Sequence, residues 1–116
     1  MKENIIDSET IEGLKRLQKP GKPDLLKELI VLFLDSTAEY MKILRAAVEN
    51  RDLGTVSHIA HSFKSSAANL GALNLSEICY ELEKIGNGEL SPEQLKDVFQ
   101  RAEKAYAEAV IHLKQL

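Results

Sequence analysis

The most informative part of this chain is residues 60–72, which read AHSFKSSAANLGA. On a helix with about 100° between successive residues, His61 points about 160° away from Phe63, which marks the apolar face. The neighbours of His61 on its own face are small, namely Ser57, Ser65 and Ala68. A histidine that only packs has no need of small neighbours, whereas one that another protein must approach does. We therefore interpret this face as a candidate docking surface.

A lysine lies one helical turn after the histidine. Lys64 is close enough for its ammonium group and His61 to share an anionic ligand. A neutral imidazole is a nucleophile near physiological pH, and a nearby lysine would neutralise part of the charge of a phosphoryl group carried on it. The alternative is a solvated histidine beside a solvated lysine, and the small neighbours favour the functional interpretation.

Helical periodicity continues through every long segment of the chain, and no strand alternation interrupts it. The segment KPGKP at residues 19–23 breaks the chain after a first short helix. The helices are predicted at residues 8–18, 24–50, 53–70, 74–85 and from 91 nearly to the C-terminus. The sequence therefore predicts an all-α fold, an up-down-up-down antiparallel four-helix bundle whose short N-terminal helix caps one end.

The helix ends carry recognisable capping signals. Asp7 or Ser8 is expected to cap the first helix and Asp52 the third, while Gly71 suits a left-handed helix end. Two capping boxes are predicted, with an N-cap and a residue that reaches back to it. They are Asn74 with Glu77, and Ser91 with Pro92 at the first helical position and Gln94.

Composition excludes several classes of protein. A length of 116 residues suits a single domain, residues 1–116, and the net charge of −3 without a basic stripe argues against nucleic acid as a partner. The lone Cys79 lies on an apolar stripe and is interpreted as core. No run approaches about 18 apolar residues, and Met1–Asn4 lack the apolar core of a signal peptide. We expect a cytoplasmic, free-standing monomer that does not interact with membranes.

A second site residue follows from counting across the hairpin between the third and fourth helices. With the turn near Ala72, His61 lies level with Glu83. A carboxylate there would accept a proton from one ring nitrogen of His61 and leave the other nitrogen facing solvent. The alternative is that Glu83 is a surface residue related to Asn87 by one turn, and the geometry alone favours neither.

Other titratable and aromatic residues carry weaker signals. His58 could join His61 in a metal site, but further ligands are not evident, and a solvated residue is the simpler interpretation. His112 lies in the last helical turn and is interpreted as structural or incidental. Tyr80 projects away from its apolar stripe, and either rims the docking surface or is simply half-exposed.

The stretch that begins at His61 resembles the signature of histidine-containing phosphotransfer (Hpt) domains. That signature has a histidine, an apolar residue, a lysine, small residues and a Gly-Ala pair in this register, and here it reads HSFKSSAANLGA. The similarity extends along most of the chain, including Leu82-Glu83. The one departure is Ser65, where the family usually has glycine; its hydroxyl would either bind a phosphoryl group or narrow the set of receiver domains that fit.

The resemblance implies the role of each site residue. His61 would be the phosphoacceptor, attacking through Nε2, Lys64 would support the phosphoryl group, and Glu83 would orient the imidazole. The implied partners are response-regulator receiver domains and a hybrid sensor histidine kinase, with Mg²⁺ on the receiver and no cofactor on this chain. The resemblance also implies no kinase or nucleotide-binding activity, and the lack of a phosphate-cradling glycine-rich loop in the sequence agrees with this expectation. The alternative function is a helical adaptor that binds receiver domains without chemistry.

Overall fold

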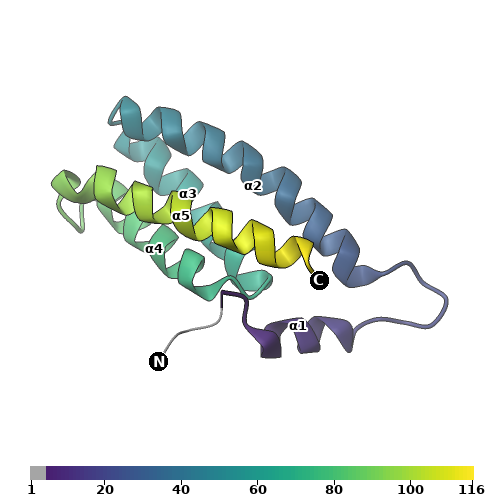
Figure 1. The fold of residues 1–116 in the computed structure, drawn as a ribbon. Helices are drawn as coiled ribbons and strands as arrows, with labels where there is room; N and C mark the ends of the chain where they lie inside the picture. Colours follow the sequence, from purple (N-terminus) through teal and green to yellow (C-terminus); the bar gives the residue numbers. More distant parts are fainter. Residues whose placement is uncertain (1–4) are drawn as a thin grey trace.

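The computed structural model describes residues 5–116 and consists of helices joined by short connections, apart from one longer loop between the first two (Figure 1). The predicted absence of a signal peptide concerns Met1–Asn4, which lie outside the described residues. The elements are α1 Ser8–Lys15, α2 Leu25–Glu49, α3 Leu53–Asn69, α4 Leu73–Gly86, the 3₁₀ turn η1 Pro92–Gln94 and α5 Leu95–Lys114. None of the described helices is long and apolar enough to cross a membrane.

Helices α2 to α5 form the predicted four-helix bundle. Each packs against the next, and α5 closes the ring against α2. The short α1 packs against α2 at the end of the bundle where α5 finishes, and Figure 1 shows the 16–24 loop swinging outward from there. The Asp7 backbone N–H donates to Gly71 O across 2.8 Å, which ties this N-terminal region to the α3–α4 turn. The prediction of an N-terminal helix that caps one end is confirmed.

Most of the predicted helix ends are confirmed by their hydrogen bonds. Asp7 caps α1 by accepting from the Thr10 backbone N–H. Asp52 caps α3 through both the backbone N–H and the hydroxyl of Thr55, and these bonds lower the pKa of Asp52. Gly71 has a φ of +80°, the left-handed conformation expected at this turn.

The predicted capping box at Asn74 is wrong, whereas the one at Ser91 is confirmed in its N-cap and in Pro92 at the first helical position, but not in a contact from Gln94. The fourth helix restarts directly after Gly71, so that Ala72 is its N-cap, no side chain caps it, and Asn74 is already helical. At the last helix, Ser91 is the N-cap, but its Oγ accepts from the Glu93 N–H because the first turn is 3₁₀. A 3₁₀ turn winds more tightly than an α-helix, so a box that needs α-helical spacing does not form.

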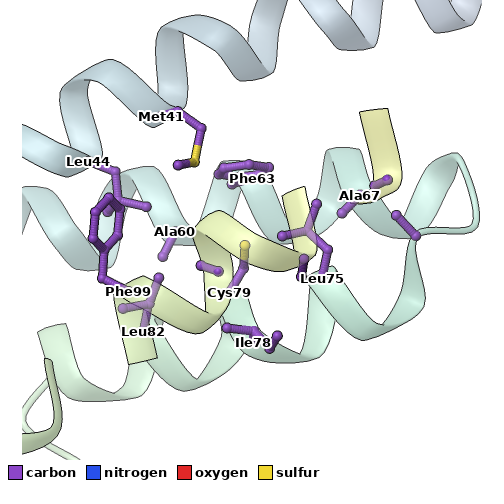
Figure 2. Packing of buried hydrophobic residues seen from close by; sticks show 14 of the residues in the cluster. Met41, Leu44, Ala60, Phe63, Ala67, Leu75, Ile78, Cys79, Leu82 and Phe99 are labelled. Carbon is purple, nitrogen blue, oxygen red and sulfur yellow. The ribbon is translucent and has the colours of Figure 1, made fainter. Parts of the chain in front are cut away.

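The inner faces of the helices form a hydrophobic core, to which α3 contributes Phe63 and α4 contributes Cys79. Phe63 is fully buried, and Tyr40 and Tyr106 pack against its ring with centroids 5.8 and 5.6 Å away. Figure 2 shows Phe63 and Cys79 in the interior together with Met41 from α2. Burial raises the pKa of the Cys79 thiol to about 12, so it stays protonated, in agreement with its predicted core position.

The α3–α4 hairpin is closed tightly at its far end by Gly86. A Cβ at this position would lie 2.6 Å from Ser57 N and 2.7 Å from Leu53 O, both backbone atoms of α3. Only glycine permits the two backbones to approach so closely. This packing fixes α4 against α3 one turn beyond Glu83.

Candidate functional site

The exposed face of α3 carries the histidine that the sequence analysis singled out. Its burial pattern sets the geometry, because the apolar face with Phe63 turns into the core and His61 is left pointing outward. The side chain of His61 is 63% exposed. The imidazole is therefore open to a macromolecular partner.

Glu83 of α4 bridges His61 and Lys64. Its Oε2 lies 2.9 Å from His61 Nδ1, and its Oε1 accepts a hydrogen bond of 2.6 Å from Lys64 Nζ. The hairpin register thus places Glu83 level with His61, as the counting across the turn predicts. The alternative of a surface residue is wrong, since the Glu83 side chain is only 15% exposed and contacts both His61 and Lys64. The side chain of Asn87, one turn further on, bonds to Ser57 and Glu89 instead.

The bridging carboxylate is ionised. The hydrogen bond from Lys64 is the largest cause that lowers the pKa of Glu83 below its ordinary value; partial burial opposes it and the bond from His61 adds to it. A carboxylate only accepts hydrogen bonds, so the Nδ1 of His61 carries the proton and donates. The lone pair of the other ring nitrogen, Nε2, is then the available nucleophile.

The backbone beneath Lys64 is also pinned to α4. The Ser76 hydroxyl donates to the Lys64 carbonyl oxygen across 2.9 Å. This bond was not anticipated from the sequence, because Ser76 carries no signal apart from its closeness to the turn. It holds α3 and α4 in register between the turn and the Glu83 contacts.

The predicted docking residues differ in how freely they face outward. Ser57 is half-buried, and its hydroxyl donates to Asn87 Oδ1 at the α3–α4 junction. Ser65 is exposed, and its hydroxyl donates to the His61 carbonyl oxygen across 3.4 Å, a weak bond that leaves the hydroxyl able to turn. Ala68 is half-buried and keeps the surface low. Of these three, Ser65 presents the most accessible polar group.

Tyr80 lies on α4 beside the lysine of the site. It is 47% exposed, and the Nζ atoms of Lys64 and Lys84 lie 4.8 and 4.5 Å from its ring centroid. Lys84 is not among the site residues predicted from the sequence. Its spacing of four residues from Tyr80 is the signal that could have found it.

The remaining histidines lie outside this cluster. His58 is exposed, and among residues 5–116 no group of three or more histidine, cysteine or acidic side chains could hold a metal. His112 lies near the end of α5, where its Nδ1 is 2.8 Å from the Glu108 carbonyl oxygen. A hollow of about 810 Å³ near His112 is lined by α1 and the end of α5 and does not include the His61 cluster. The His61 cluster therefore lies apart from this hollow, on an exposed face of α3.

Comparison with known proteins gives a consistent result. The family model described as Hpt domain matches residues 28–115. Histidine-containing phosphotransfer proteins 5 and 2 of Arabidopsis thaliana are 26% and 25% identical to this chain over 85 residues, which are 71% of this chain and 54% of each relative. The chain spans about half the length of these curated relatives.

A solved structure matches the whole fold. The crystal structure of histidine-containing phosphotransfer protein B (HptB) from Pseudomonas aeruginosa PAO1 superposes with a TM-score of 0.83 and 28% sequence identity. The superposition covers 96% of this chain and 92% of that one. The similarity therefore includes the regions on both sides of the α3–α4 hairpin.

Proposed function

The chain belongs to the Hpt domain family, and we propose that it acts as a phosphorelay intermediate with His61 as its phosphoacceptor. The proposal rests on one observation, which is that the imidazole of His61 is exposed while a carboxylate fixes its tautomer. His61 is 63% exposed, while Glu83 holds its Nδ1 proton across 2.9 Å. This arrangement directs the Nε2 lone pair toward an incoming phosphoryl group.

The transfer step is an in-line displacement at phosphorus. The Nε2 lone pair of His61 forms the N–P bond, the acyl-phosphate P–O bond of a receiver aspartate breaks, and its electron pair stays on the receiver carboxylate. Because Nδ1 keeps its proton, the phosphorylated ring is an imidazolium, and the Glu83 carboxylate across 2.9 Å stabilises that charge. Catalysis of this kind rests on alignment and charge stabilisation.

Lys64 is assigned to the phosphoryl group. Its ammonium group lies one turn from His61 and is held by Glu83 across 2.6 Å before transfer. A doubly charged phosphoryl group on Nε2 would compete with Glu83 for this cation, and would accept a charge-assisted hydrogen bond from it. The Mg²⁺ of the reaction is assigned to the receiver domain, as the resemblance to the Hpt domain family implies.

The partners follow from the same chemistry. We assign response-regulator receiver domains as donors and acceptors of the phosphoryl group, with a hybrid sensor histidine kinase as its source. The exposed imidazole with small residues around it suits a docking protein, and the chain is assigned no kinase activity of its own.

The test is transfer of labelled phosphate from a receiver domain that has been charged with a small phosphodonor. We expect the wild-type chain to gain an acid-labile label, and the His61→Gln variant to gain none. His58→Gln is the matched control, since His58 is exposed one turn away on the same helix and should leave labelling unchanged. Labelling that persists in His61→Gln would contradict the assignment. Binding to receivers without any gain of phosphate would favour the adaptor function instead.

A further inference from the structure

The ring of Tyr80 lies close to two lysines from two different helices, beside the cluster of His61, Lys64 and Glu83. The ammonium groups of Lys64 on α3 and Lys84 on α4 lie 4.8 and 4.5 Å from its ring centroid. Both distances fall within the range in which an aromatic face attracts a cation. The same ring thus contacts Lys84, which has no role in the transfer step, and Lys64, which is assigned to the phosphoryl group.

The two lysines differ in their acidic partners. Lys64 is paired with Glu83 across 2.6 Å, whereas Lys84 forms no ion pair with any residue from 5 to 116. Glu81 lies three residues before Lys84, but both of its carboxylate oxygens accept from Arg101 of α5. Glu89 accepts from the Asn87 side chain. The positive charge of Lys84 is therefore not paired with a carboxylate among residues 5 to 116.

The position of Lys84 beside the transfer site indicates which protein would contact its charge. Lys84 directly follows Glu83 on α4 and shares an aromatic ring with Lys64, so it borders the phosphoryl-transfer site. We propose that Tyr80 and Lys84 form a docking contact for acidic side chains of the receiver domain, beside the site of transfer. This inference rests on the proposed function, which brings an acidic receiver surface to His61. It commits to a protein partner with carboxylates at the rim of its phosphorylation pocket.

The aromatic ring explains why this lysine suits docking. A free lysine loses rotamer freedom when it binds, and a side chain already held over a ring loses less. Tyr80 is 47% exposed and Lys84 is half-buried, so a partner carboxylate can reach the ammonium group over the ring. Charges of this kind at the rim of an interface act mainly on the rate and salt dependence of association. Lys84 should consequently affect how fast a receiver docks, and leave the transfer step within the complex unchanged.

The experiment measures phosphotransfer to this chain from phosphorylated receiver domains of the source organism. The receiver domain that transfers fastest is used, at several ionic strengths. For Lys84→Gln we expect the second-order transfer rate at low salt to fall about 3- to 10-fold, with a shallower salt dependence. The single-turnover rate at saturating receiver should stay at the wild-type value. Lys42→Gln is the matched control, because it removes the same charge from an exposed position on α2.

Tyr80 is tested by two variants that separate its ring from its hydroxyl. Tyr80→Phe keeps the aromatic face and should transfer like wild type, whereas Tyr80→Leu should match Lys84→Gln in its second-order rate. The double variant Tyr80→Leu/Lys84→Gln should have nearly the same second-order rate as either single variant, because both substitutions remove the same docking contact.

Three outcomes would overturn the inference. The first is an equal second-order transfer rate for Lys84→Gln and Lys42→Gln. The second is a lower single-turnover rate for Lys84→Gln than for wild type, and the third is a second-order rate that falls as far in Tyr80→Phe as in Tyr80→Leu. If the wild-type chain gains label and His61→Gln does not, these outcomes reject the docking contact alone. If no receiver labels the wild-type chain, the proposed function itself fails and the docking contact falls with it.

Discussion

Helix α3 presents two faces that respond to different physical demands. Its inner face, with Ala60, Phe63 and Ala67 fully buried, is shaped by close packing against the other helices. Its outer face holds His61, whose side chain is 63% exposed and whose main protein contact is a single carboxylate on α4. One face of α3 therefore serves stability, and the opposite face serves the chemistry of the site. Substitutions on the inner face should change the free energy of unfolding, and those on the outer face should change phosphotransfer.

The largest expected effect comes from the inner face. Phe63→Ala removes a fully buried ring that Tyr40 and Tyr106 contact, and should lower the free energy of unfolding by about 3–5 kcal/mol. Urea denaturation followed by circular dichroism measures this change. Ser65→Ala on the exposed face is the control and should stay within about 0.5 kcal/mol of wild type. Similar losses in the two variants would break the distinction between the faces.

The next effect concerns the link between α3 and α4. Glu83→Gln keeps the size of the side chain but removes the charge that faces His61 Nδ1 and Lys64 Nζ. We expect phosphotransfer to His61 to slow about 10- to 100-fold, because the imidazolium formed on transfer loses its counter-charge. Single-turnover labelling at saturating receiver measures the rate. A rate equal to that of wild type would show that Glu83 has no part in the transfer.

A smaller effect is expected at Lys64, and it has a signature in pH. Its hydrogen bond is the largest cause of the lowered pKa of Glu83, so Lys64→Met should raise that pKa toward the ordinary value while slowing transfer about tenfold. The folded-state pKa lies below the unfolded value, so the stability that Glu83 contributes is complete above the unfolded pKa. That stability is lost as the pH falls through the lowered, folded-state pKa.

Carboxyl-carbon NMR titration of Glu83 measures the pKa in both proteins. In wild type it should titrate below an ordinary glutamate, and in Lys64→Met the difference should shrink. The acid-induced loss of stability linked to Glu83 should shrink with it. An unchanged titration in the variant would contradict the ion pair.

The smallest effect is expected at Ser65, where the chain departs from its family. Ser65→Gly should cost about 0.5 kcal/mol of stability, because glycine is the poorer helix former. Its phosphotransfer rates should change by less than about threefold, because the serine hydroxyl makes only a 3.4 Å bond to the His61 carbonyl. A panel of receiver domains tests this directly. A strong change in which receivers react would instead identify Ser65 as a determinant of specificity.

The sequence was sufficient for the bundle and for the level of Glu83 on α4, and the reasons are physical. Long amphipathic helices with short connections leave few ways to pack, and a short α3–α4 turn fixes which residues lie level, so Glu83 could be placed level with His61. The same geometry left open whether the Glu83 side chain turns toward the imidazole, and the structure shows that it does. The Gly71 turn was also predictable, because a left-handed φ favours glycine.

Other features depended on exact turn geometry or on side-chain directions. The Asn74 capping box failed because α4 already begins at Leu73, so that Asn74 lies inside the helix and cannot be its N-cap. The contact of Lys64 and Lys84 with Tyr80 required knowing how long, flexible side chains cross between two helices. Such contacts arise only once the backbones are placed.

The most direct test of the central claim is to identify the atom of His61 that carries phosphate. We predict that NMR of the ¹⁵N-labelled, phosphorylated chain will show phosphorus–nitrogen coupling at Nε2 of His61, with Nδ1 still bearing its proton toward Glu83. Coupling at Nδ1, or a phosphoryl group on any other residue, would contradict the account.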